Sequence, residues 1–171
     1  TTLTLGTSGD TIAIPSGVTL ANSGTVTGIG NTNAPVFYAY GSSGISLSNN
    51  AFTKITFNTE VVDASGIYDT SNSRVTFGST GRFVLSVRLV IGSVASQQYT
   101  VRLYRNGSSW RDVFTDYFSN STDMNVNGYI LLNNESASDY YEVYVYQNSG
   151  STETTESGMQ SLFFAGYKII E

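Results

Sequence analysis

The sequence has no cysteine and no histidine, and charged residues make up only 12% of its 171 positions. Without cysteine there is no disulfide and no thiolate that could ligate a metal. Without histidine there is no Ser/His/Asp or Cys/His catalytic arrangement, and both the usual general base and the commonest metal ligand are lacking. Most hydrolase chemistry is therefore excluded, and we expect a protein that is not an enzyme.

Positive charge is also scarce. The chain has 8 Lys and Arg residues against 13 Asp and Glu residues, which gives a net charge of −5. Binding to nucleic-acid phosphates or to an anionic lipid surface normally uses a basic patch, so we expect neither partner. The longest apolar runs are far shorter than the roughly 20 residues that a membrane helix needs, so no membrane insertion is expected.

The composition of the chain changes near Asn31–Pro35. Aromatic residues make up 13% of the sequence, but none precedes Phe37, and the only charge in the first 34 residues is Asp10. The change predicts an N-terminal segment, residues 1–34, and one domain, residues 35–171.

Short apolar pairs alternate with turn signals in the N-terminal segment. Ile12 and Ile14 form one pair, Val18 and Leu20 form the next, and Pro15–Gly17 is the turn between them. A single ribbon of this kind cannot bury enough apolar surface to offset its chain entropy, so it is either disordered or shares a core with other chains. We expect three ribbons to pack these four apolar side chains around one axis, as a β-rich trimeric shaft.

Residues 35–171 show the period-two alternation of β-strands and no helical periodicity of useful length. The clearest pattern runs through RFVLSVRLVI at residues 82–91, where every second side chain is apolar. Further strands are predicted at Val36–Tyr40, Lys54–Phe57, Arg74–Phe77, Gly128–Leu132, Tyr140–Gln147 and Ser161–Ile170, with a hairpin turn at Asn106–Gly107. Many short strands separated by Gly, Asn and Ser turns predict an all-β sandwich or jelly roll.

The predicted strand at Tyr140–Gln147 is apolar on both of its faces. Tyr140, Tyr144 and Tyr146 share one face, which in a two-layer sandwich would normally meet water. A neighbouring loop could cover it. Tyrosine is enriched at the cores of protein interfaces, however, and we expect these three side chains to lie in a subunit interface.

Segments of this domain, in order, resemble the C1q/TNF-like family of trimeric jelly-roll domains. They are Ala34–Tyr40, Ile55–Leu89, Leu103–Gly107, Ser138–Gly150 and Ser161–Ile170. The resemblance implies a jelly-roll β-sandwich that forms a homotrimer through apolar and aromatic strand faces and acts as a binding head. Gly78, Phe83 and Ser138 depart from the family pattern, and Ser108–Asn127 has no counterpart and reads as a loop-rich segment.

The N-terminal segment, LTLGTSGDTIAIPSGVTLANSGTVTGIG, resembles the repetitive shaft segments of bacteriophage tail fibres. The two resemblances together imply an extracellular protein of the virion, the C-terminal head of a tail fibre or similar fibre. Such a head attaches the particle to a glycan or protein of the host cell surface. Two alternatives stay open: a structural module that only trimerises and caps the fibre, and an extracellular C1q-like lectin.

The segment Ser108–Asn127 contains the candidate receptor-binding residues Trp110, Tyr117 and Phe118. An aromatic side chain beside polar residues can stack on a sugar ring, or it can plug the end of the sandwich. Two further functions, Ca²⁺ binding and glycoside hydrolysis, have weaker support in the sequence. Asp112, Asp116 and Asp123 lack the spacing of a calcium loop and are expected to be solvated carboxylates. A carboxylate pair such as Glu153 and Glu156 could hydrolyse glycosides, but Thr152–Ser157 is most simply a solvated loop. No cofactor or metal is expected.

Overall fold

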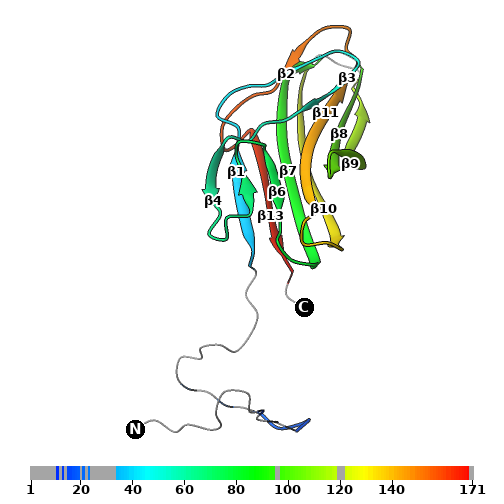
Figure 1. Cartoon of the computed structure of the whole chain (residues 1–171). Helices are drawn as coiled ribbons and strands as arrows, with labels where there is room; N and C mark the ends of the chain where they lie inside the picture. The colour runs from blue at the N-terminus through cyan, green and yellow to red at the C-terminus, as the bar shows by residue number, and fades with distance from the viewer. Residues whose placement is uncertain are drawn as a thin grey trace. The chain divides into compact units, whose positions relative to one another are not determined.

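Figure 1 shows the computed structural model of the chain, which describes residues 11, 13, 15–19, 21 and 23 and residues 34–94, 97–118 and 122–169. The chain divides into two compact units, Thr1–Gly30 and Asn31–Glu171. The described part contains no helix long and apolar enough to cross a membrane.

The turn signal of the N-terminal unit is found in the structure. The Val18 N–H donates to the Pro15 carbonyl oxygen over 3.2 Å, and Gly17 takes a φ of 84° that favours glycine. Val18 is 59% exposed in the single chain, as expected for a residue whose apolar contacts would come from other chains. Ile12, Ile14 and Leu20 lie outside the described residues, so the shaft interface stays a prediction.

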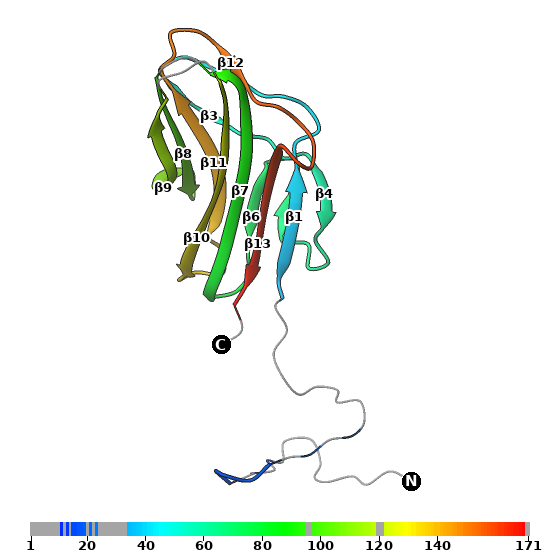
Figure 2. The same ribbon diagram turned by 180° about the vertical axis from the view of Figure 1, so that it is seen from behind.

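The second unit is a sandwich of two five-stranded antiparallel sheets, which face each other in Figures 1 and 2. The β7 sheet has the order β10 (Thr122–Asn134), β7 (Gly81–Val94), β13 (Leu162–Lys168), β1 (Val36–Tyr40) and β4 (Thr59–Val62). The β8 sheet has the order β5 (Tyr68–Asp69), β6 (Arg74–Thr76), β11 (Tyr140–Gln147), β8 (Gln98–Arg105) and β9 (Ser108–Tyr117). The short strands β2 (Ser46–Leu47) and β12 (Glu153–Thr154) pair with each other, and β3 (Ala51–Lys54) lies beside β11.

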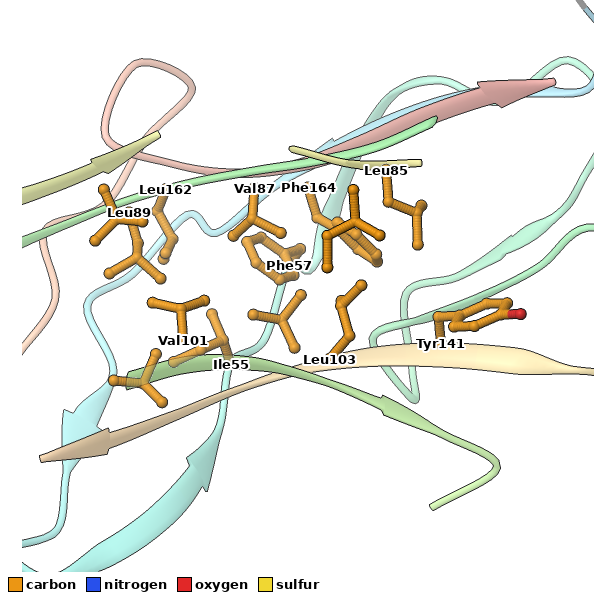
Figure 3. Packing of buried hydrophobic residues seen from close by; sticks show 14 of the residues in the cluster. Ile55, Phe57, Leu85, Val87, Leu89, Val101, Leu103, Tyr141, Leu162 and Phe164 are labelled. Carbon is orange, nitrogen blue, oxygen red and sulfur yellow. The ribbon is translucent and has the colours of Figure 1, made fainter. Parts of the chain in front are cut away.

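The alternation of the sequence builds the core between these sheets. All five alternating apolar residues of β7 are buried. Figure 3 shows three of them, Leu85, Val87 and Leu89, facing Val101 and Leu103 of β8 and Tyr141 of β11. The inward-facing residues of these three strands are Phe83, Leu85, Val87, Leu89, Ile91, Tyr99, Val101, Leu103, Tyr141, Val143 and Val145. Each large apolar side chain buried in this way stabilises the fold by about 1.5–3 kcal/mol. The predicted all-β jelly-roll sandwich is confirmed.

The turn at Asn106–Gly107 joins β8 to β9 as predicted. Both residues have positive φ, 53° and 75°, which is the backbone that a tight hairpin with the native twist requires. A second glycine, Gly166 on β13, is required by packing. A Cβ there would lie 2.7 Å from Leu85 Cδ2 and 2.8 Å from Phe37 Cε1, so a side chain would displace the core.

Two predictions about local structure are wrong. The predicted strand at Lys54–Phe57 ends at Lys54, although the Ile55 N–H still donates to the Val143 oxygen over 2.9 Å. The segment Ser108–Asn127 is not loop-rich, because it supplies β9 and the beginning of β10. Register shifts between β8 and β9 break the period-two pattern there, so alternation could not reveal the strand.

Candidate functional site

The outer face of the β7 sheet is built from apolar side chains of strands that are distant in the sequence. One row of cross-strand neighbours runs Leu131, Val84, Tyr167 and Val36, and the next runs Tyr129, Ser86, Ala165, Tyr38 and Val62. A further row brings Phe163 between Arg88 and Tyr40. We call the apolar members of these rows the β7 face: Val36, Tyr38, Tyr40, Val62, Val84, Tyr129, Leu131, Phe163, Ala165 and Tyr167.

The β7 face is open to solvent in the single chain. Tyr129 is 78% exposed, Leu131 55% and Tyr167 42%. Nearby, the Tyr38 hydroxyl donates to the carbonyl oxygen of Met159, another exposed apolar residue, over 2.8 Å. Scattered apolar residues are normal on a surface, but a continuous patch marks a site of protein association. The β7 face is therefore a candidate self-association surface.

One cation, Arg88, lies inside this surface without a counter-ion among the residues that the structure describes. Arg88 stands opposite Phe163 on one side and Asn127 on the other. Its Nε is buried and has no hydrogen-bond acceptor among the described residues, and the described carboxylates form no ion pair with it. A buried N–H donor of this kind normally has a partner. In the part of the single chain that the structure describes, Arg88 Nε therefore lacks a hydrogen-bond acceptor.

The outer face of the β8 sheet carries a second aromatic group, which we call the tyrosine cluster: Phe52, Tyr104, Tyr144 and Tyr146. The rings of Tyr104 and Tyr144 stack at a centroid distance of 3.9 Å. Phe52 of β3 lies 6.0 Å from the Tyr104 ring and 5.3 Å from the Tyr146 ring. All four side chains are half-buried, so the cluster is rigidly packed and still reaches the surface.

The charges around the tyrosine cluster are paired with one another. The Arg102 guanidinium lies 4.6 Å above the Phe52 ring and forms a bidentate ion pair with Asp112. Lys54 Nζ lies 2.5 Å from Glu142 Oε1. Burial raises the pKa of the Tyr144 hydroxyl, and the nearby Glu142 carboxylate adds to this shift. The Tyr144 hydroxyl is therefore neutral at physiological pH, and the charges around the cluster are paired.

The structure places the three tyrosines of the predicted interface on this outer face of β11. Tyr144 and Tyr146 belong to the tyrosine cluster, and the Arg74 guanidinium lies 4.7 Å from the centroid of the Tyr140 ring. Part of the cover for this face therefore comes from strands of the same chain. The interface role of these tyrosines stays a prediction.

The predicted receptor-binding residues lie at two ends of β9. Trp110 packs on the core with its ring 5.6 Å from that of Tyr141, and Phe118 lies 5.8 Å from the Tyr99 ring. Tyr117 is 63% exposed. Seven residues of extended strand separate Trp110 from Tyr117 by roughly 23 Å, so the strand does not bring them into one site. Their receptor role stays a prediction, and packing accounts for Trp110 and Phe118.

The acidic residues named from the sequence do not gather. Asp112 is paired with Arg102, and Glu156 accepts a hydrogen bond of 2.9 Å from the Ser161 hydroxyl. No three acidic side chains in the described ranges come close enough to hold a metal ion.

Sequence reasoning missed Phe52, Tyr104 and Arg102 as members of a surface site. Alternation in YTVRLYRNG does place Arg102 and Tyr104 opposite the buried Val101 and Leu103. Nothing in the short β3 sequence indicated that Phe52 would join them.

The architecture has counterparts among solved structures. The globular domain of zebrafish complement 1qA superposes with a TM-score of 0.55 at 18% identity, covering 80% of this chain and 98% of that one. The Eiger TNF of S. frugiperda gives 0.56 at 10% identity, with 80% and 92% covered. The fold is a C1q/TNF-like jelly roll. The resemblance seen in the sequence is thereby confirmed at the level of fold.

The C1q/TNF-like domain also resembles a vertex protein. The PRD1 vertex protein P5 superposes with a TM-score of 0.50 at 14% identity, covering 78% of this chain and 96% of that one. No family model matches the sequence, and no curated protein matches it. Likeness at these identities establishes the fold of residues 34–169 alone.

Proposed function

We propose that the chain is the homotrimeric head of a virion fibre, such as a phage tail fibre, and that it attaches the particle to a glycan or protein of the host surface. The observation that carries this proposal is the continuous, exposed β7 face. A C1q/TNF-like fold implies threefold packing through apolar strand faces, and the β7 face is the surface that such packing would cover. This role is binding without catalysis.

The energetics of the β7 face favour association. Each exposed aromatic or aliphatic side chain that becomes covered contributes about 1 kcal/mol or more. A symmetric trimer uses the same patch three times, so modest contributions add up. Tyr144 and Tyr146, by contrast, already pack against Phe52 and Tyr104 in their own chain, so they gain less from a second copy.

The virion context rests on two likenesses. The fold is shared with a phage vertex protein, and the N-terminal segment resembles tail-fibre shafts. An alternative role, a cap that trimerises without binding a receptor, is favoured by the same β7 face because it needs no further site.

Sedimentation and cell binding test these roles together. We expect the chain to sediment as a trimer at micromolar concentration and the trimer to bind cells that the parent particle infects. A monomer would contradict both roles. A trimer that binds no such cells would contradict attachment and leave the capping role.

Arg88 gives a sharper test of the β7 face. We expect Arg88→Met to weaken association by about tenfold, because a second copy would supply the acceptor that Arg88 Nε lacks among the described residues. Arg82→Met, which removes a charge from the exposed end of the same strand, is the control. Concentration-dependent sedimentation of both variants measures the effect. Tighter association of Arg88→Met would contradict a partner-supplied acceptor.

A further inference from the structure

We infer that the tyrosine cluster binds an uncharged saccharide. This inference deepens the proposed attachment function and rests on it. It assigns the ligand to the outer face of the β8 sheet, and not to Trp110, Tyr117 or Phe118.

The first argument is the chemistry that the cluster presents. A pyranose ring has faces of C–H groups and a rim of hydroxyls. Aromatic rings fixed by packing accept the C–H faces at little entropic cost, because their rotamers are already held. The Tyr104–Tyr144 stack and the Phe52–Tyr146 contact hold the rings in this way.

The polar groups at the edge of the cluster suit the rim of a sugar. The Tyr146 hydroxyl donates to Asn50 Oδ1 over 3.3 Å, and Arg102 Nη1 donates to Ser109 Oγ over 3.1 Å. The hydroxyls of Tyr146 and Ser109 and the amide of Asn50 can both donate and accept hydrogen bonds, and Arg102 can only donate them. Ligand sites usually combine an apolar platform with a few such polar groups.

The second argument is charge. The cations on the outer side of β3, β6 and β8 each lie beside a carboxylate: Lys54 with Glu142, Arg74 with Asp69 and Arg102 with Asp112. An anionic sugar would have to break one of these pairs. Leaving the freed carboxylate unpaired is most costly at the Lys54–Glu142 pair, because the Glu142 side chain is only 8% exposed. The face therefore selects against charged ligands.

The third argument excludes strand addition, which is a common mode of peptide binding. A peptide often binds a sheet by adding a strand at a free edge. β11 is an interior strand, paired with β8 from Tyr141 to Gln147 and with β6 at its beginning, and β3 lies beside it. Its backbone is engaged, so recognition on this face must use side chains.

The position of the cluster allows it to act in the proposed trimer. The β7 and β8 sheets are opposite layers of the sandwich, so their outer faces point away from each other (Figures 1 and 2). Covering the β7 face would leave the tyrosine cluster accessible on each copy. Three weak sites on one head would bind a glycan-coated surface with much higher avidity than one.

A glycan array tests the inference with the full chain. The probes are neutral oligosaccharides of glucose, galactose, mannose and N-acetylglucosamine, together with sialylated and sulfated forms. We expect binding to neutral probes, and a loss of about tenfold in affinity for Tyr144→Ala and for Tyr104→Ala. Tyr144→Phe keeps the ring and should retain binding. Val61→Ala, at an exposed apolar position on β4 of the other sheet, should bind as wild type.

The outcomes separate the inference from the function on which it rests. Binding only to charged probes, or full binding by both alanine variants with sedimentation unchanged, would overturn the inference. Binding to host cells without binding to any neutral saccharide would also overturn it and leave the attachment function standing. A monomer that binds neutral saccharides through Tyr144 would support the inference and contradict the trimeric head.

Discussion

Tyr167→Asp is expected to convert the proposed trimer into monomers at micromolar concentration. Tyr167 lies in the middle of the β7 face, between Val84 and Val36. A carboxylate there meets water in a monomer but would be desolvated without a partner in an assembly that covers this face. The cost is about 2–4 kcal/mol at each interface, and a symmetric trimer incurs it three times. Sedimentation velocity over a range of concentrations measures the change.

Tyr117→Asp is the matched control, because it makes the same exchange at an exposed position on β9 of the other sheet. It should leave the trimer intact. Both variants should remain folded by circular dichroism, since both side chains point outward. Dissociation caused by Tyr117→Asp and not by Tyr167→Asp would place the interface on the β8 sheet, where the sequence had suggested Tyr140, Tyr144 and Tyr146.

Local patterns in the sequence predicted most of the fold. The alternation from Phe83 to Ile91 identified β7 and its buried face, and Asn106–Gly107 identified the hairpin. These features depend on the period of a strand and on the φ angles of a turn, which neighbouring residues determine. For the same reason the bulged strand β9 was missed, because its register shifts remove the period.

The β7 face could not be predicted in the same way. Its central row combines residues 36, 84, 131 and 167, which only the strand order brings together. In β13 both sides are apolar: Phe164 faces inward and Phe163 faces outward. Alternation separates the two sides of such a strand, but only tertiary packing decides which side is the core. The sequence indicated a two-faced strand at β11, and β13 is a second one.

Because the two sides of β13 have different surroundings, we expect different effects when its neighbouring phenylalanines, Phe163 and Phe164, are replaced by alanine. Phe164 is fully buried, with ring centroids 5.0 Å from Phe37 and 5.6 Å from Phe57. Phe164→Ala should lower the free energy of unfolding by about 3–5 kcal/mol, because it removes a large core side chain and leaves a cavity. Chemical denaturation at several protein concentrations measures this loss, which should be similar at each concentration.

Phe163→Ala removes the same side chain from the adjacent position, where the ring lies 5.2 Å from that of Tyr38 on the β7 face. The free energy of unfolding of the monomer should change by less than about 1 kcal/mol, because no core cavity forms. Its effect should appear as weaker association. The loss of stability relative to wild type should therefore be small at low protein concentration, where both chains are monomeric, and larger at high concentration, where assembly stabilises the wild-type chain by mass action. Equal, concentration-independent losses for Phe163→Ala and Phe164→Ala would contradict the assignment of one side of β13 to the core and the other to self-association.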